Sequence, residues 1–174
     1  SFNRLDQLEA IASSHELAAV KMEVQRSAPP DPGFLEGVRA LCNRLGIVLI
    51  FDECTSGFRE TLGGLHLNFG VEPDLAIFGK ALGNGYAITA TIGRRAVMDA
   101  AQTSFISSTF WTERIGPTAA LKTLEVMERE RSWERVTAIG LELRRQWQTL
   151  ADRHGLSISH NGLPALGGFA IQSE

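Results

Sequence analysis

The stretch Ile47-Val-Leu-Ile-Phe51 constrains the fold of this chain more strongly than any other segment. It is uninterrupted, apolar and rich in β-branched residues, and it comes after a segment whose apolar residues recur at helical spacing up to Gly46. A strand that is apolar at every position and comes directly after a helix is typical of a parallel sheet covered on both faces. We therefore expect an α/β fold with Ile47–Phe51 as a central strand.

Two other stretches extend this pattern along the chain. Leu75–Phe78 predicts a second buried strand, and Ala87–Gly93 predicts a third. A long helix is expected from Pro117, followed by another helix and a glycine-rich tail typical of short strands. The order of these elements is that of an α/β domain, with a boundary expected near residue 130.

The composition narrows the class of protein. The chain has 174 residues, of which 44% are apolar and 21% charged, and its net charge is −3. These values are typical of a globular domain that acts on small molecules, and they argue against nucleic-acid binding, which requires clustered lysine and arginine. No stretch is long enough to predict a membrane span, and no signal peptide is recognisable. The two cysteines form no CxxC pair, so we expect reduced thiols, a cytoplasmic location and no metal site.

Ionisable residues stand at the ends of two predicted strands, Asp52 directly after the first and Lys80 shortly after the second. In a parallel sheet the carboxyl ends of neighbouring strands meet at one edge, where functional groups collect. An aspartate after a buried strand favours a cationic partner, and a lysine in an apolar pocket becomes a nucleophile at neutral pH. A pyridine aldehyde suits both groups, since it offers a carbonyl to the lysine and a protonated ring nitrogen to the aspartate. The residues therefore point to pyridoxal 5'-phosphate (PLP) as the cofactor.

Two longer motifs make this interpretation specific. Phe51-Asp-Glu-Cys-Thr-Ser-Gly-Phe-Arg59 resembles the FDEV-x-x-GFR segment of class III aminotransferases, the group that includes glutamate-1-semialdehyde aminomutase. Pro73-Asp-Leu-Ala-Ile-Phe-Gly-Lys-Ala-Leu-Gly-Asn-Gly85 resembles their lysine segment, and Gly93-Arg-Arg-Ala-Val-Met-Asp99 resembles the family segment that comes next along the chain. The similarity extends from about Leu5 to the end of the chain.

The resemblance implies a fold and a set of site residues. The fold is the aspartate-aminotransferase-like (fold type I) α/β architecture, with part of the PLP-binding major domain in residues 1–130 and the start of a small α+β C-terminal domain in residues 131–174. Lys80 would form a Schiff base with the cofactor and shuttle a proton, and Asp52 would pair with the ring nitrogen. Cys54 takes the place of a family valine and would pack on one face of the ring.

The resemblance also implies a second subunit. Thr109 takes the place of a family threonine that reaches the phosphate of the cofactor held by the other subunit, so a homodimer is implied. The stretch around Thr109 differs from the family's shorter turn, which leaves Ser108 and Thr112 as alternatives. Glu23 aligns with the end of a family strand and is expected near the pocket.

The activity that the resemblance implies is amino-group transfer between a small-molecule amino donor and a carbonyl acceptor, through Lys80. Two alternatives stay open. An isomerase of the glutamate-1-semialdehyde 2,1-aminomutase type would use the same residues. Family members are also much longer, with an upstream phosphate loop and a stacking aromatic residue, so this chain is expected to be a piece of such a protein. A catalytically incomplete fragment that serves only for binding or structure is the second alternative.

Some of the same residues allow simpler explanations. Ile47–Glu53 also fits the magnesium-binding strand of a nucleotide hydrolase, but that class requires a GxxxxGK[ST] loop, which the sequence lacks. Glu53 and Arg59 are expected to form a structural ion pair, and His66 is expected in a loop or at the surface.

Overall fold

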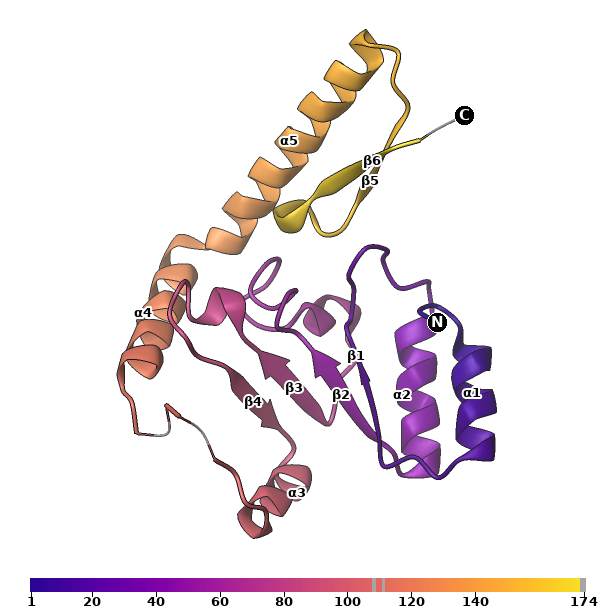
Figure 1. The fold of residues 1–174 in the computed structure, drawn as a ribbon, viewed down its shortest axis with the longest axis vertical. Helices are drawn as coiled ribbons and strands as arrows, with labels where there is room; N and C mark the ends of the chain where they lie inside the picture. The colour runs from indigo at the N-terminus through magenta and orange to yellow at the C-terminus, as the bar shows by residue number, and fades with distance from the viewer. Residues whose placement is uncertain (108, 111, 173–174) are drawn as a thin grey trace.

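The computed structural model describes residues 1–107, 109–110 and 112–172 (Figure 1). The helices and strands are, in chain order, α1 (Leu5–Ser14), β1 (Ala19–Met22), α2 (Phe34–Leu45), β2 (Val48–Asp52), β3 (Leu75–Phe78), β4 (Ala90–Gly93), α3 (Arg95–Met98), α4 (Ile115–Glu130), α5 (Ser132–Arg153), β5 (Ile158–Asn161) and β6 (Gly168–Ile171). Short 3-10 helices lie at Leu65–Phe69, Lys80–Leu82, Asp99–Thr103 and Pro164–Leu166. Among the described helices, none combines the length and the apolar composition that spanning a bilayer requires.

A four-stranded sheet in the order β1-β2-β3-β4 forms the centre of the fold. β1, β2 and β3 are parallel, so the two buried strands expected from Ile47–Phe51 and Leu75–Phe78 are confirmed. The third expected strand is shorter than Ala87–Gly93 and runs antiparallel to β3. Parallel strands need a crossover of a dozen or more residues, and only the loop of residues 79–89 separates β3 from β4. The chain therefore turns back at this edge of the sheet.

The described residues bury only one face of this sheet. Along β2, Leu49 and Phe51 are fully buried, whereas Val48 and Ile50 are half-buried. α2 covers Leu49 and Phe51, and α4 packs near Ala76 of β3, which is the register partner of Phe51 and so lies on the same face. Because both helices cover one face, the prediction of a sheet covered on both faces is wrong for the described part of the chain.

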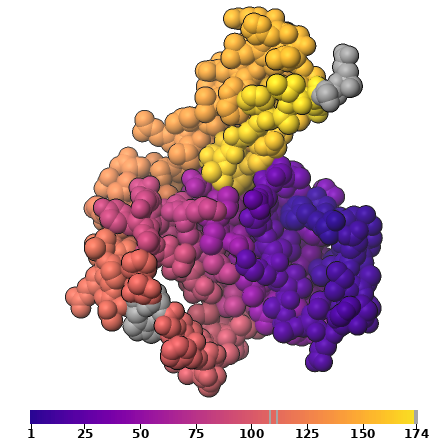
Figure 2. All heavy atoms as spheres, in the orientation of Figure 1, coloured from indigo at the N-terminus to yellow at the C-terminus, as the bar shows by residue number. Residues whose placement is uncertain are grey.

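Residues 131–172 form an arm that leads away from the sheet. α4 ends where Arg131 adopts a left-handed conformation (φ 47°), and α5 leaves in a new direction (Figure 1). β5 and β6 form a hairpin beside α5, and Figure 2 shows this arm as a narrower lobe above the broader body. Gly140 permits a close approach, since a Cβ there would lie 2.0 Å from the carbonyl oxygen of Pro164. Leu163 is buried in the same core cluster as Leu49 and Phe51 and thus ties the arm to the body.

Asp74 joins three elements just before β3. One carboxylate oxygen accepts hydrogen bonds from the backbone N–H of Leu49 and from Nη1 of Arg39, both at 2.8 Å. The other accepts from Nη1 of Arg94 at 2.7 Å. Burial alone would raise the pKa of this carboxyl, but the hydrogen bonds from Leu49, Arg94 and Arg39 outweigh it and hold the pKa below its ordinary value. The buried carboxylate is therefore ionised at neutral pH and fastens β2, α2 and the end of β4 together.

Replacing Asp74 with alanine is expected to lower the free energy of unfolding by about 3–5 kcal/mol, the usual cost of removing one partner of a buried ion pair. The loss arises because the Leu49 amide and the Arg39 guanidinium, which is itself largely shielded, would lose their acceptor. Unfolding in urea, monitored by circular dichroism, measures this loss in the free energy of unfolding. Asp6→Ala is the matched control, because Asp6 pairs with Arg4 at the surface and should leave the midpoint nearly unchanged. Equal midpoints for the two variants would contradict this role of Asp74.

Candidate cofactor site

The carboxyl ends of β2 and β3 carry the two ionisable groups that the sequence singles out. Asp52 is the last residue of β2 and the register partner of Ile77, and Lys80 comes after β3 and Gly79. The segment after Asp52 links them. An Asp52 carboxylate oxygen accepts the backbone N–H of Cys54 at 3.1 Å, and the hydroxyl of Thr55 accepts from Nζ of Lys80 at 2.5 Å. The structure thus brings Asp52, Cys54 and Lys80 to one edge of the sheet.

Lys80 has an unusual backbone conformation. Its φ is 44°, in the left-handed region, and it opens the short helix Lys80–Leu82. Its carbonyl accepts the backbone N–H groups of Gly83 and Asn84 at 3.2 and 3.1 Å, and these bonds hold the turn. Such a conformation costs a non-glycine residue about 1–3 kcal/mol and is more frequent at functional sites than elsewhere.

The environment of the Lys80 amino group is polar and open. Lys80 is exposed, so the described residues do not form the apolar pocket that is expected around it from the sequence. Among the described residues, no carboxylate lies within ion-pair distance of its Nζ, and its partner there is the hydroxyl of Thr55. The described residues therefore hold the Lys80 amine through a hydroxyl group and not through an ion pair with a carboxylate.

Asp52 is held by a cation from the neighbouring strand. Nζ of Lys21, on β1, lies 2.7 Å from Oδ2 of Asp52. The hydrogen bond from Lys21 lowers the pKa of Asp52, against the raising effect of partial burial, and the N–H of Cys54 adds to the lowering. The same hydrogen bond raises the pKa of Lys21. Asp52 is therefore an anion at neutral pH, as required of a group that holds a protonated ring nitrogen.

Cys54 lies between the two charged groups and is not a reactive thiolate. Burial raises the pKa of its thiol, and the hydrogen bond and the charge of Asp52 raise it further, whereas Lys80 and Lys21 lower it. A Cβ built on Gly79 would lie 3.4 Å from its sulfur, which places the thiol beside the backbone that leads to Lys80.

The other predicted site residues lie outside this group. Thr109 is exposed in a turn, and in the described part of the chain no hydrogen bond joins it to Asp52, Cys54 or Lys80. Thr112 is likewise an exposed turn residue, and Ser108 falls outside the described residues. Glu23 is half-buried just past β1, with Arg26 at 3.8 Å.

Two residues of the site itself are not predicted from the sequence. Thr55 holds the Lys80 amine, and its position three residues past a buried strand could have suggested that role. Lys21 pairs with Asp52, and the only hint in the sequence is a charge within an otherwise apolar strand.

Two predictions about the residues next to the site are wrong. Glu53 pairs with His66 and Ser56 rather than with Arg59, and His66 is buried in the short 3-10 helix Leu65–Phe69 rather than in a loop or at the surface. Oε1 of Glu53 accepts the backbone N–H of His66 at 3.0 Å and lies 2.8 Å from Nδ1 of its ring, and Oε2 accepts the Ser56 hydroxyl at 2.5 Å. Burial would raise the pKa of Glu53, but these hydrogen bonds outweigh it and lower the pKa. A fully buried carboxylate is tolerated when its oxygens are paired with donors in this way.

Replacing Glu53 with glutamine is expected to lower the free energy of unfolding at neutral pH by about 1–3 kcal/mol. The NH2 group of the new amide would face hydrogen-bond donors, with which it cannot pair. The pKa of Glu53 is lower in the folded than in the unfolded state, so its contribution is present above about pH 4.3 and is lost as the pH falls through the folded value. As the pH is lowered, the free energy of unfolding of the variant should therefore fall less steeply than that of the wild type. Urea unfolding at a series of pH values measures both effects. Glu128→Gln at an exposed position of α4 is the control, and parallel acid profiles for the wild type and Glu53→Gln would contradict the assignment.

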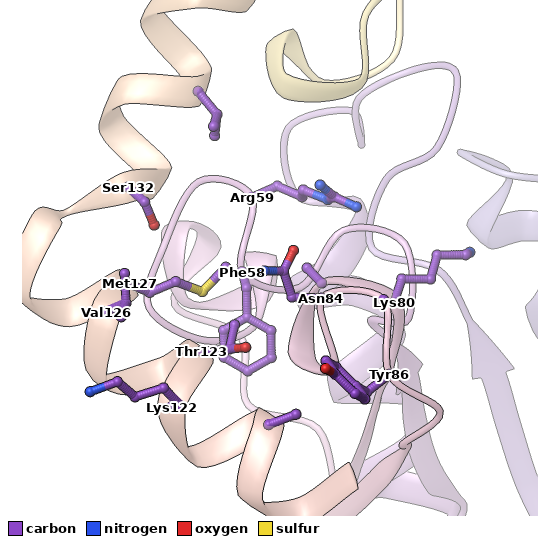
Figure 3. Close-up of a pocket in the computed structure, with 15 residues that line it drawn as sticks. Phe58, Arg59, Lys80, Asn84, Tyr86, Lys122, Thr123, Val126, Met127 and Ser132 are labelled. Carbon is purple, nitrogen blue, oxygen red and sulfur yellow. The ribbon is translucent and has the colours of Figure 1, made fainter. Parts of the chain in front are cut away.

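A cavity of about 620 Å³ lies next to this site but is distinct from it. It opens between α4 and the loops that carry Phe58 and Asn84, and Lys80 borders it with its stem (Figure 3). In Figure 3 the Lys80 side chain extends away from Phe58 and Thr123. Neither Asp52 nor Cys54 lines the cavity, so the charged groups at the strand ends, and not this cavity, mark the candidate cofactor site.

The groups at the strand ends fit PLP. The cofactor requires a lysine amine free to bond its aldehyde and an anion for its protonated ring nitrogen. Lys80 supplies an amine without a carboxylate partner among the described residues, and Asp52 supplies a carboxylate whose pKa is held low. Both are tied to the same short segment, Cys54–Thr55, which sets their relative position.

Comparison with known proteins agrees with this site. The family model "Aminotransferase class-III" matches residues 3–169. The chain is 41% identical over 175 residues to the 3-aminobutyryl-CoA aminotransferase of Cloacimonas acidaminovorans (strain Evry), a match that covers 94% of this chain and 42% of that protein.

Solved structures resemble the fold closely. The PLP internal aldimine form of the FumI protein of Sphingopyxis sp. MTA144 superposes with a TM-score of 0.93 at 28% identity, over 99% of this chain and 44% of that one. An omega-transaminase from Sphaerobacter thermophilus gives 0.89 at 28% identity, over 99% of this chain and 42% of that one. The chain thus spans less than half the length of each of these relatives, and its architecture is the α/β fold type I of PLP-dependent transaminases. On this evidence the chain belongs to the class III aminotransferases, a PLP-dependent family.

Proposed function

We propose that this protein is a PLP-dependent aminotransferase that moves an amino group between a small-molecule amino donor and a carbonyl acceptor. The observation that carries the proposal is the meeting of Lys80 and Asp52 at neighbouring strand ends, both bonded to the segment Cys54–Thr55. Aminotransfer is preferred to an aminomutase-type isomerisation because two of the relatives described above are named as aminotransferases or transaminases.

Each residue has a proposed role. Lys80 bonds the cofactor and, once released by the amino donor, takes the proton from the donor's α-carbon. Thr55 orients the Lys80 amine, because its hydroxyl accepts a hydrogen bond from Nζ. Asp52 holds the proton on the ring nitrogen, and Cys54 packs beside the ring. When bound, PLP supplies an electron sink that makes the α-proton of the donor acidic.

A homodimer completes the proposed site, with Thr109 reaching the phosphate of the cofactor held by the other subunit. The support comes from the described segments on either side of Thr109 in the sequence. Four large apolar side chains there are strongly exposed, and they would be covered by a second copy of the chain; they are Phe105, Ile106, Ile115 and Leu121.

Two further parts of the proposal concern organisation and location. We propose that residues 1–130 belong to the major domain and that the small domain begins at residue 131, where α4 gives way to α5. We also propose a cytoplasmic location, which is compatible with the unpaired thiols of Cys42 and Cys54.

Borohydride trapping tests the proposal. The complete protein is incubated with PLP, reduced with borohydride and digested, and the modified peptide is identified by mass spectrometry. The chain has three lysines, Lys21, Lys80 and Lys122, so the position of the label is decisive. Label on Lys80, together with a visible absorption band that disappears on adding an amino donor, would support the proposal. Label on a lysine other than Lys80, label spread over several lysines, or no band would refute it.

A further inference from the structure

Lys21 lies where the sheet geometry presents it to the cofactor site. It stands in β1, between Val20 and Met22, and its register partner on β2 is Ile50. Side chains two residues apart on a strand share a face, so Lys21 and Asp52 project from the same half-buried face of the sheet. A lysine within an apolar strand is unusual, and this one contacts the carboxylate assigned to the ring nitrogen.

Lys21 completes the coordination of Asp52. Its Nζ lies 2.7 Å from Oδ2, while Oδ1 accepts the N–H of Cys54 at 3.1 Å. Both oxygens are therefore partnered, and the carboxylate plane is fixed. A carboxylate offers about four lone-pair directions, so it can still accept a ring N–H. It would then divide its single negative charge between the Lys21 ammonium group and the cofactor ring.

We propose that Lys21 is a positioning residue of the cofactor site, which orients the Asp52 carboxylate and limits how strongly it retains the proton on the ring nitrogen of PLP. This inference rests on the proposed function. Two positive groups, the Lys21 ammonium and the ring nitrogen, compete for one carboxylate. Lys21 therefore weakens the hold of Asp52 on the ring proton and adds a positive charge to the site in which the cofactor would titrate.

The charged groups around this pair fix the sign of the effect. Glu23, on the chain after β1, and Cys54, on the segment after β2, act on the charge of Lys21. Lys80, after β3, acts on Cys54. The Cys54 thiol is neutral at neutral pH because burial raises its pKa. Glu23 has Arg26 at 3.8 Å, which offsets part of its charge. Removing the Lys21 charge therefore leaves the site more negative, and every proton bound to the cofactor should be held more tightly.

Three substitutions separate charge from structure. Lys21→Met removes the charge and keeps most of the side-chain length, and Lys21→Arg keeps the charge. Lys122→Met is a close match for Lys21→Met, because Lys122 pairs with Glu125 at 2.6 Å and its side chain is 64% exposed, compared with 2.7 Å and 56% for Lys21. The experiment uses the complete protein with PLP bound and follows the pH titration of its visible absorption band.

The expected result is a selective upward shift. In Lys21→Met the midpoint of the titration should rise by about 0.5–1 pH unit, the size expected when one partly exposed charge is lost near a titrating group. Lys21→Arg and Lys122→Met should stay near the wild-type midpoint. NMR titration of the protein without cofactor should also show a higher pKa for Asp52 in Lys21→Met, since the hydrogen bond from Lys21 is the main cause that lowers it.

The outcomes distinguish this inference from the proposed function. If Lys21→Met shows the Lys80-dependent absorption band with the same titration midpoint as the wild type, the proposed function is not affected and the role of Lys21 is overturned. Equal shifts in Lys21→Met and Lys122→Met would overturn it as well, because they would show only a general loss of positive charge. A wild-type protein without any Lys80-dependent band would overturn the proposed function, and the role of Lys21 with it.

Discussion

Lys80→Ala is expected to abolish the visible band of the bound cofactor and to lower kcat for amino transfer by about 10³-fold or more, since one group serves as both nucleophile and proton carrier. The structural reason is that the Lys80 amine, bonded to Thr55 at the carboxyl edge of the sheet, is the candidate nucleophile at the site that holds Asp52. Absorbance spectroscopy and steady-state kinetics with an amino donor measure the two losses.

Two controls make the Lys80 experiment specific. Lys80→Arg keeps the positive charge but cannot form the covalent bond or release a proton readily, so it should be as inactive as Lys80→Ala. Lys122→Ala removes an exposed lysine of α4 and should leave band and turnover unchanged. The prediction fails if Lys80→Ala retains a borohydride-sensitive band, because another amine would then be holding the cofactor.

Asp52→Asn is expected to lower kcat by about 10²-fold or more, which corresponds to about 2.7 kcal/mol of transition-state stabilisation. Asparagine has nearly the same shape but no charge, so it cannot stabilise a protonated ring nitrogen. Loss of the partly exposed pair with Lys21 should cost little folding stability, and thermal unfolding checks this. The kinetic defect should therefore appear in a folded protein.

A spectroscopic readout ties the Asp52 defect to the cofactor. With PLP labelled with ¹⁵N in the ring, the nitrogen chemical shift should move from the protonated to the unprotonated range in Asp52→Asn. Asp31→Asn, an exposed aspartate in the loop before α2, is the matched control and should behave as wild type. A protonated ring nitrogen in Asp52→Asn would exclude the assigned role of Asp52.

Some aspects of the site could be predicted because they depend on local sequence. The apolar stretches Ile47–Phe51 and Leu75–Phe78 specify strands through their own composition. Each is followed by an ionisable residue, Asp52 or Lys80, whose burial without a partner would cost free energy. When such strands are parallel neighbours, their carboxyl ends meet at one edge without further information. Asp52 and Lys80 are therefore identifiable from the sequence, and the family motifs around them point to PLP.

Other aspects depend on contacts between distant parts of the chain. The pairing of Glu53 with His66 requires the chain between them to fold back toward the end of β2, and no local sequence pattern specifies this course of the chain. The burial of one sheet face alone is a consequence of where α2 and α4 pack, and the reversal at β4 is a consequence of the short loop before it.

By itself, the sequence determined the identity of the strands, the acid and the amine at their ends, and the family of the chain. Only the tertiary structure decided that Lys21 stands against Asp52, because that contact depends on the register in which β1 aligns with β2. A shift of one residue would turn Lys21 to the opposite face of the sheet, and register is set by the packing of the whole sheet rather than by either strand alone.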